Sequence, residues 1–540
     1  MRGRSRWLDV LLSLLFLVIL YIFFIRRTYL SDLRQSLGND APTGGHIDNA
    51  PQSIDSPLLV PKKTNDMTKE EENQARTNEI LDHIPDTRSD SCKAESHGSE
   101  IPTSFVIDFF DYSFYDIRVT ISSVLKFTPE SLIRDIVVID DGSTLDHIII
   151  EAQAYVDKIP KAILVRHEDR QGQGRSRMRG VKESMGANIV FLDSNAVVTP
   201  GWLEPLASYI QKEQHVVAVP HLNRIKDPVS YEFIKTDNLA VASINLNLEI
   251  VMSRTKGSSQ DVMSPAIRGS VFAITRDYFK QIGGLDPYLS DGGGDMLEMS
   301  LRTWLCGGSV KVVGCSKVGI LNYNDPVKIM NNRNKWRISE LWMSEYKDPI
   351  AKSSNRDLAS NIGDVDKRSL QTRRLDIEKL QCVHDTKWYF DNIATDVFIP
   401  PTNAVVQGFL QIKNGHCARI GEDKRIDLGS CNPQKHDLVP RDMMFVLTSE
   451  GHLTIGSLCI GTPTSFYMIP GKCDIKDENQ KWTYDNKKRL VNFKSKFCAM
   501  HVTDPDPKMK DQKRQIAMAQ DCSADKSKDL EFSSWKFISD

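Results

Sequence analysis

The chain has 540 residues, which is long enough for two to four domains. Its 69 Lys and Arg residues nearly balance its 71 Asp and Glu residues, so it lacks the bulk positive charge that drives nucleic-acid binding. Hydrophobic residues make up 40% of the chain and charged residues 26%. This ordinary globular composition excludes wholesale disorder, collagen-like repeats and a multi-span membrane protein.

The N-terminal region contains an apolar run of a length that suits a membrane. Trp7–Ile25 is interrupted only by Asp9 and Ser13, and arginines flank it on both sides. A bilayer core needs about 20 apolar residues, whereas a cleaved signal peptide usually has an apolar core of about 7–15. We therefore expect a tail at residues 1–6 and a transmembrane signal anchor at 7–25. The flanking arginines alone leave its orientation open.

The next segment, residues 26–95, is polar and rich in Asn, Asp, Thr and Pro, which predicts a flexible stem. Beyond it, short apolar runs alternate with stretches of helical spacing. The runs expected to form buried strands are Phe105–Phe110, Asp135–Asp140, Ala162–Arg166 and Asn188–Asp193. Strand–helix alternation predicts a doubly wound α/β domain, which binds ligands at the carboxyl ends of its strands.

Two of these strand ends carry carboxylates. One run ends in Asp140 and Asp141, and another ends in Asp193, followed by Ser194 and Asn195. An aspartate at a strand end is often only a turn former or the N-cap of the next helix. Together at one sheet edge, the two strand ends suit a sugar nucleotide, with one end near uridine and ribose and the other near a diphosphate and its metal.

The rest of the chain divides into three parts. A second α/β segment runs from about residue 216 to 346, and a linker of mixed charge follows at 347–408. Residues 409–540 show short strands separated by Gly, Asn and Asp turns, which predicts an all-β domain. Three similar units there each contain two cysteines, which indicates an internal threefold repeat.

Several stretches, in this order and spacing, resemble the polypeptide N-acetylgalactosaminyltransferase family from about Cys92 to Asp540. They are PTSFVIDF, VIDDGS, DRQGQGRSRMRGV, IVFLDSNAVVTPGWLEPL, SPAIRGSVFAITRDYF, GGDMLEMSLRTWLCGG, CSKVG, RISELWMSEYKD and LQCVHDTKWYFDN. The resemblance implies a glycosyltransferase-A (Rossmann-like) catalytic domain at 96–346 and a ricin-type β-trefoil lectin domain at 409–540. It also implies a single-pass type II protein of the Golgi membrane, which uses UDP-GalNAc and Mn²⁺ and transfers GalNAc with retention to Ser or Thr of acceptor proteins.

The resemblance further implies a disulfide pairing that uses all ten cysteines. The pairs are Cys92–Cys315, Cys306–Cys382, Cys417–Cys431, Cys459–Cys473 and Cys498–Cys522. Because disulfides form in oxidising compartments, the residues after the apolar run should be lumenal.

The expected metal site departs from the family pattern. The family's Asp-x-His motif is Asp193-Ser194-Asn195 here, and the position of its third ligand, a histidine, is Ile320. An amide oxygen is a weaker ligand than an imidazole for such a metal, and isoleucine is none. We therefore expect Asp193 and Asn195 to bind metal weakly, unless Asn322, Asn324 or Asp325 substitutes.

The remaining site residues are also assigned by resemblance. The substrate-binding set is Asp108, Asp140, Asp141, Arg170, Ser194 and Gly292, and Asp295 is the catalytic candidate. Asp108 stands where the family has a small polar residue, and a Trp-Gly-Gly-Glu-Asn motif reads Gly292 to Met296 here. The sugar-binding Cys-Leu-Asp of each lectin repeat has lost its Asp, which is replaced by Arg419, Gly461 and Met500.

Two functions follow as hypotheses. The first is transfer of GalNAc from UDP-GalNAc to Ser or Thr, the step that initiates mucin-type O-glycosylation. The alternative is a catalytically impaired family member that acts as a Golgi scaffold or modulator, because the metal histidines are Asn195 and Ile320. No nucleic-acid partner is expected.

Overall fold

The computed structural model describes residues 68–533 with gaps. The gaps are 96–97, 99–100, 228, 235–238, 246, 256–260, 270, 290–292, 322–329, 348–349, 351–357, 361, 400, 402, 412–415, 422–423, 431–442, 464–466, 487, 504–514, 521 and 523–530. The expected tail, anchor and first part of the stem therefore lie outside the described residues. Within the described ranges, no helix is both long and apolar enough to cross a bilayer.

All four strands expected from the apolar runs are confirmed. They are β1 (Thr103–Phe109), β2 (Ile133–Asp140), β3 (Ala162–Arg166) and β4 (Asn188–Asp193). These strands are parallel and lie in the order β3-β2-β1-β4. Runs rich in Val, Ile and Phe form such strands because both faces of a parallel sheet are covered.

The second half of the sheet makes it mixed rather than wholly parallel. Strand β11 (Phe272–Thr275) lies antiparallel between β4 and β6 (Val216–Ile225), and β12 (Ser309–Ile320) runs parallel to β6. The carboxyl ends of β1, β2, β4, β6 and β12 therefore meet at one edge. The shorter strands of this sheet are β5 (Ala196–Val198), β7 (Phe233–Ile234) and β10 (Val262–Met263). Strands β8 (Leu239–Ile244) and β9 (Ile250–Thr255) form a separate two-stranded sheet.

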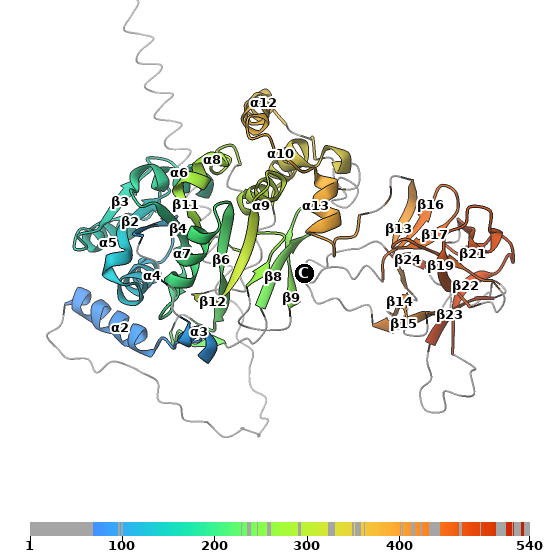
Figure 1. The fold of residues 1–540 in the computed structure, drawn as a ribbon, viewed down its shortest axis with the longest axis horizontal. Coiled ribbons are helices and arrows are strands. Elements are labelled where there is room, and N and C mark those ends of the chain that lie inside the picture. The colour runs from blue at the N-terminus through green and yellow to red at the C-terminus, as the bar shows by residue number, and fades with distance from the viewer. Residues whose placement is uncertain are drawn as a thin grey trace, which may run out of the picture. The chain divides into compact units, whose positions relative to one another are not determined.

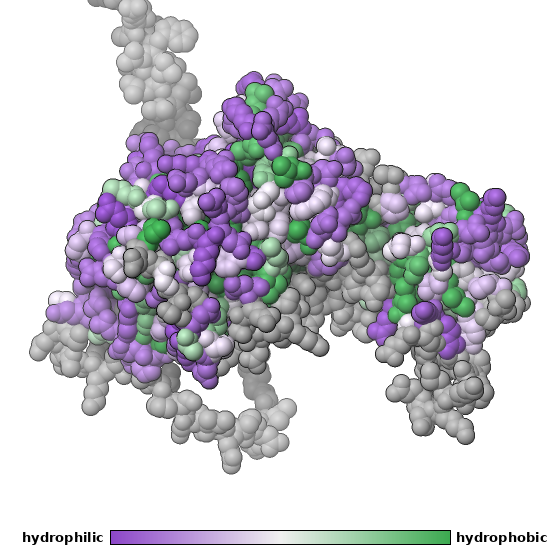
Figure 2. All heavy atoms as spheres, in the orientation of Figure 1, coloured by the Kyte–Doolittle hydropathy of each residue, from purple (hydrophilic) through white to green (hydrophobic). Residues whose placement is uncertain are grey.

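Helices cover both faces of this sheet (Figure 1). One core contains residues of α4 (Phe114–Phe127), α5 (Asp146–Val156) and α7 (Leu203–Lys212). The other contains residues of α6 (Gln173–Glu183), α8 (Arg276–Gln281), α9 (Asp295–Leu305) and α10 (Asn332–Trp342). In Figure 2 the outward surface over these helices is mostly hydrophilic, as amphipathic helices on a sheet require. The doubly wound architecture is thus confirmed.

Part of the predicted stem is folded, which corrects the expectation of a flexible segment up to residue 95. Helix α2 (Lys69–His83) begins at a capping box, in which Thr68 and Glu71 satisfy each other's backbone N–H groups. Its Ile80 and Leu81 pack with Val119 of α4. The short helix α3 (Asp90–Ala94) follows. The few apolar residues of α2 hide its helical period, and the cap is its clearest sequence signal.

The predicted linker at 347–408 is also corrected, because two of its helices belong to the sheet domain. They are α12 (Asp364–Glu378) and α13 (Thr386–Asn392). Leu370, Tyr389 and Phe390 are buried in the same core as α9 and α10. The catalytic-domain boundary expected at 346 is therefore too early, because this core extends to Val397.

Buried ion pairs connect these helices. The Arg337 guanidinium of α10 donates two hydrogen bonds to Asp286, at 2.8 and 3.0 Å, and one to Ser369 Oγ of α12 at 3.0 Å. Within α9, Arg302 donates to both carboxylate oxygens of Glu298. Charged residues thus fill part of this core. The mixed charge of the sequence around α12 therefore predicted a linker where the structure has a packed helix.

The C-terminal part is an all-β domain, as expected. Its described strands are β13 (Ala404–Gln411), β14 (His416–Ile420), β15 (Ile426–Ser430), β16 (Phe445–Thr448), β17 (Leu453–Ile455), β18 (Leu458–Gly461), β19 (Ile469–Lys472), β20 (Trp482–Tyr484), β21 (Leu490–Asn492), β22 (Cys498–Thr503), β23 (Gln515–Gln520) and β24 (Glu531–Ser533). Three antiparallel hairpins, β14–β15, β18–β19 and β22–β23, each have a cysteine in their first strand. They agree with the threefold repeat. The domain begins at Ala404, five residues before the expected start.

Four of the five predicted disulfides are confirmed. They are Cys92–Cys315, Cys306–Cys382, Cys459–Cys473 and Cys498–Cys522. The fifth pair includes Cys431, which lies outside the described residues. Cys306–Cys382 joins the end of α9 to the segment before α13. This disulfide therefore attaches part of the expected linker, residues 347–408, to the sheet domain.

Candidate functional site

Two acidic side chains lie next to each other at the carboxyl edge of the sheet. Asp108 of β1 and Asp193 of β4 are register partners in adjacent parallel strands. Each lies two residues after a residue of the α6-side core, which is Val106 in β1 and Phe191 in β4. Strand periodicity therefore directs both carboxylates toward the face that α6 covers.

Arg177 of α6 bridges these two carboxylates. Its Nε donates to Asp108 Oδ1 at 2.6 Å, and its Nη2 donates to Asp193 Oδ1 at 3.0 Å. The guanidinium has no exposed surface. Burial alone would lower the pKa of Arg177, but the charges of Asp108 and Asp193 raise it above its usual value. Gln173, one helical turn earlier, also donates to Asp108 and Asp193, at 3.2 and 3.4 Å.

Asp295 extends this acidic group from the start of α9. A Cβ placed on Gly174 of α6 would lie 2.6 Å from Asp295 Oδ1, so the first turns of the two helices touch. That oxygen is buried and accepts no hydrogen bond from the described residues. Burial raises the pKa of Asp295 to about 7, although the charge of Arg177 opposes the shift.

Asp141 has a structural role at the start of α6. Its carboxylate accepts hydrogen bonds from the backbone N–H groups of Gln171 and Gly172 and from Ser176 Oγ. These bonds satisfy donors at the N-terminus of the helix, as a capping carboxylate does. Asp141 therefore has the structural role that is common for an aspartate at a strand end. A contact between Asp141 and a nucleotide stays a prediction.

The neighbouring Asp140 and Arg170 lie on either side of a tight approach between two loops. Asp140 Oδ1 accepts a hydrogen bond from the Ser143 backbone N–H at 2.8 Å, and Oδ2 lies 3.3 Å from Arg166 Nε. Gly142 has φ +76°, and a Cβ there would lie 2.6 Å from the backbone nitrogen of Arg170. Only glycine fits this position, which brings the loop after β2 against the loop before α6. The exposed Arg170 guanidinium lies 3.8 Å from the centre of the Phe110 ring.

The two expected metal ligands, Asp193 and Asn195, lie near Ile320, which stands at the position of the family's third ligand. Asn195 Nδ2 donates to the Leu321 carbonyl at 2.8 Å, and Ile320 pairs with Ala196 of β5. Asn195 Oδ1 is buried without a hydrogen-bond donor among the described residues. The Ile320 side chain packs against the core that contains α4 and α7. Asp193 is therefore the one carboxylate at these positions, and Arg177 already binds it.

No group of three or more His, Cys, Asp or Glu side chains in the described parts of the chain could hold a metal ion. The possible substitutes Asn322, Asn324 and Asp325, and the substrate candidate Gly292, lie outside the described residues. Ser194 is buried, and its carbonyl accepts a hydrogen bond from Thr120 Oγ1 at 2.9 Å. The described residues thus do not fit Mn²⁺ with three protein ligands.

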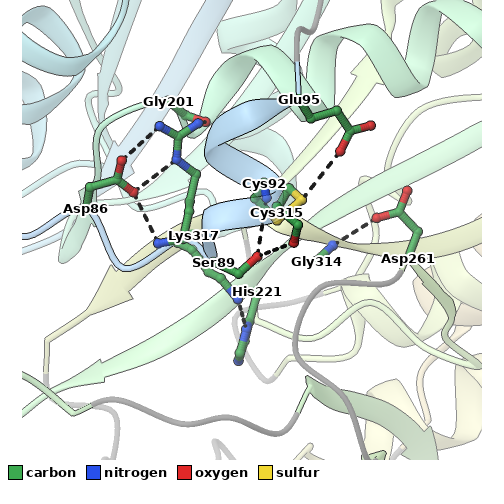
Figure 3. Close-up of a disulfide and its surroundings, with 12 residues drawn as sticks. Asp86, Ser89, Cys92, Glu95, Gly201, His221, Asp261, Gly314, Cys315 and Lys317 are labelled. Atoms are coloured by element: carbon green, nitrogen blue, oxygen red, sulfur yellow. Dashed lines mark hydrogen bonds and ion pairs between the residues drawn. A yellow bond between two sulfur atoms is a disulfide. The ribbon is translucent and has the colours of Figure 1, made fainter.

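A buried basic pair lies in β6 and β12, before the carboxyl ends of these strands and beside the Cys92–Cys315 disulfide (Figure 3). Lys317 Nζ and His221 Nδ1 are 2.6 Å apart in register-paired strands. Burial lowers the pKa of Lys317 to about 8, and burial with the charges of Lys317 and Arg268 lowers that of His221 to about 3. The histidine is therefore neutral and accepts a hydrogen bond from the lysine.

Comparison with known proteins assigns a class to this arrangement. A family model described as glycosyl transferase family 2 matches residues 104–282. The crystal structure of GalNAc-T7 with UDP, GalNAc and Mn²⁺ covers 91% of this chain and 96% of its own, with a TM-score of 0.53 and 22% identity. The sheet domain therefore has the GT-A fold.

Two curated relatives narrow the class. Human polypeptide N-acetylgalactosaminyltransferase 13 is 30% identical over 398 residues, which are 70% of this chain and 69% of that protein. Polypeptide N-acetylgalactosaminyltransferase 11 of Xenopus tropicalis is 29% identical over 430 residues, 76% of this chain and 66% of that protein. The chain belongs to the polypeptide N-acetylgalactosaminyltransferase family.

Sequence reasoning placed the acidic strand ends correctly but missed Arg177 and Gln173. Arg177 lies on the buried face of α6, with Gly174, Ser176, Gly180 and Val181. A charged residue among small buried ones is the signal that could have identified it, because an arginine buried on a helix face needs carboxylate partners.

Proposed function

We propose that this chain transfers GalNAc from UDP-GalNAc to Ser or Thr hydroxyl groups of proteins, the step that initiates mucin-type O-glycosylation. The observation that carries this proposal is the 30% identity to human polypeptide N-acetylgalactosaminyltransferase 13 over most of both chains. The GT-A sheet supports it, because the acidic strand ends lie at the edge where such folds bind ligands.

The chain's own residues have separate tasks in this proposal. The side of the site that binds the sugar donor UDP-GalNAc consists of Asp108, Asp140, Asp141, Arg170, Ser194 and Gly292. Arg170 offers a positive charge at the rim of this part of the site. Asp295 is the catalytic candidate, because a carboxyl group with a pKa of about 7 suits proton transfer near neutral pH. Mn²⁺, where the family uses it, neutralises diphosphate charge. The described ligands do not fit that ion, so no step here depends on it.

The second candidate is a catalytically impaired member that acts as a lumenal scaffold or modulator of active transferases. A specific observation favours it: Asn195 and Ile320 replace two histidine ligands, and Arg177 binds the remaining carboxylate. Without a metal, the two negative charges of a bound diphosphate would be poorly neutralised, which weakens leaving-group stabilisation.

We further propose a setting in the Golgi membrane, with a type II signal anchor at 7–25 and lumenal domains. The confirmed disulfides support an oxidising compartment.

We propose that the all-β domain is a ricin-type β-trefoil. Its three repeated hairpins and the buried Trp482, which donates to the Ile460 carbonyl at 2.8 Å, support this fold.

One experiment separates the two candidates. The lumenal chain is titrated with UDP in the calorimeter with and without Mn²⁺, and the same preparation is assayed for GalNAc transfer to Ser/Thr peptides. Transfer above that of an Asp295→Asn variant supports the enzyme. UDP binding without transfer, or neither of the two, supports the impaired member.

A further inference from the structure

A groove between α6 and α8 lies away from the acidic strand ends. The two helices lie side by side (Figure 1), and the backbone N–H of Leu285, soon after α8, donates to Met178 Sδ at 3.3 Å. The α6–α8 groove has a volume of about 700 Å³, which is within the range of ligand pockets. Its α6 residues run from Met178 to beyond the end of the helix, whereas Gln173 at the start of α6 reaches the acidic strand ends. The groove is therefore separate from the candidate site.

The floor of the groove is apolar. Val181 and Phe279 are buried there, and Met178 is half-buried. Gly284 (φ +60°) leaves room for Met178, because a Cβ on this glycine would lie 2.7 Å from the methionine sulfur. Met185 also lines the groove and is 65% exposed. Methionine side chains are flexible and polarizable, so this floor can adapt to apolar groups of different shapes.

The charged residues that line the groove are all basic. Lys182 of α6 and Lys280 of α8 are exposed, and neither forms an ion pair with a described residue. None of the described residues that line the groove is acidic. Glu183, next to Lys182, pairs instead with Arg179 at 2.8 Å. The apolar floor is thus bordered by positive charge.

Arg276 adds a third cation, and the end of α6 holds it in place. Its guanidinium donates to the carbonyls of Gly186 and Val181, at 2.6 and 2.8 Å, and to Ser184 Oγ at 2.8 Å. These bonds use three of the five N–H groups of an arginine, so the others can donate to an anion in the groove. Arg276 also offsets the negative carboxyl end of α6, which leaves Lys182 available for a partner.

We propose that the α6–α8 groove binds an acidic peptide segment of a partner protein, in which a large apolar side chain is flanked by Asp or Glu. The apolar side chain would occupy the floor, and the flanking carboxylates would pair with Lys182, Lys280 and Arg276. A burial of this kind gives affinity, and the complementary charges give specificity and faster association. The exposed Met185 favours a peptide over an enclosed small molecule, because it offers apolar surface to an extended chain.

The first test uses the lumenal chain and a fluorescein-labelled hexapeptide with a Leu-Phe centre and acidic residues on each side. Fluorescence anisotropy should show saturable binding that weakens as the salt concentration rises, because the charges involved are exposed. One control peptide carries Asn and Gln in place of the acidic residues, and another carries Ser-Ser in place of Leu-Phe. Each should bind at least about tenfold more weakly.

The second test changes the protein. We expect Lys182→Glu with Lys280→Glu to weaken binding of the acidic peptide at least about tenfold. The control pair, Lys212→Glu with Lys367→Glu, changes the net charge equally at exposed lysines of α7 and α12 and should leave the affinity unchanged. Met185→Ser should weaken binding about threefold, because it removes apolar surface at an exposed position. If the charge-reversed groove variant is unstable, Lys182→Gln with Lys280→Gln is measured instead.

Three outcomes would overturn the proposal. The first is equal affinity for the acidic and neutral peptides, or an equal loss with the two lysine pairs, since either would mean general charge attraction. The second is no binding at millimolar peptide. The third concerns vesicles of phosphatidylserine and phosphatidylcholine. Vesicle binding that the Lys182 and Lys280 replacements abolish, without peptide binding, would assign the groove to a membrane surface.

Discussion

At the scale of single residues, Asp295 is a buried side chain whose ionisation opposes folding. Burial raises its pKa from 3.8 to about 7, so the folded chain binds more protons than the unfolded chain between these two values. Stability from this group is present in full below about pH 4 and decreases as the pH rises toward 7. Three pKa units correspond to about 4 kcal/mol, so the effect is measurable.

We expect Asp295→Asn to raise the free energy of unfolding at pH 7 by about 2–4 kcal/mol, because the amide carries no charge to bury. At pH 4 the variant and wild type should be nearly equal. Urea unfolding across this pH range measures the difference, with the exposed Asp277→Asn as control. A variant with the same pH slope as wild type would contradict the pKa shift.

The sequence predicted the positions of the acidic residues but not their tasks. Strand periodicity located Asp140 and Asp193 at the correct edge, because a buried run ends where its first polar residue appears. It could not tell that Asp141 caps α6 or that Arg177 binds Asp193. Those contacts join residues that are 16 to 31 positions apart, and only the fold brings them together.

At the scale of elements, α12 is part of the sheet domain because its ion pairs and apolar residues are buried. Arg337 of α10 binds Asp286 and reaches Ser369 of α12, and Leu370 enters the core. Arg373 of α12 lies 3.6 Å from Glu298 of α9. The ion network therefore connects α9, α10 and α12, and its loss should release more than one helix.

We expect Arg337→Met to destabilise the fold by about 3–5 kcal/mol, because the buried Asp286 carboxylate loses the guanidinium that donates two hydrogen bonds to it. The control is Arg374→Met, which removes a half-exposed pair with Glu340 and should cost less than about 1 kcal/mol. Chemical denaturation of both variants gives the comparison. Similar losses for the two would mean that the Asp286 pair contributes no more than a surface pair.

The elements that the sequence predicted best are those with a clear hydrophobic period. All four strands fall where their apolar patterns lie. Helices α2 and α12 were missed because both are strongly polar and are held by a few apolar residues and by caps or ion pairs. Such helices depend on tertiary contacts, which a pattern along one segment does not contain.

At the scale of the whole molecule, we expect the C-terminal domain not to bind sugar. The positions that carry Asp in the family's sugar-binding repeats are Arg419, Gly461 and Met500, in β14, β18 and β22. We expect no measurable binding of GalNAc, because each repeat lacks its acceptor for sugar hydroxyls. The tested segment should begin before Ala404, so that β13 is complete. Chemical-shift changes that saturate at low millimolar GalNAc would contradict the expectation.

We also expect the chain to be anchored by Trp7–Ile25 with its domains in the lumen. In sealed microsomes, protease added outside should shorten the chain only slightly, because the bilayer protects everything after the anchor. Detergent added before the protease is the control and should expose the domains. Complete digestion without detergent would indicate the reverse orientation.

The capping box at Thr68 and the Cys92–Cys315 disulfide together bear on where proteolysis can shorten the chain without disturbing the fold. A protease that cut the chain anywhere before Thr68 would leave α2 capped and packed on α4. The released fragment would retain the whole GT-A domain and its disulfide to β12. A cut between α2 and α3 would instead remove α2 but leave α3 covalently attached through Cys92. A fragment that begins at about residue 68 therefore keeps the cap of α2, its packing on α4 and the disulfide to β12.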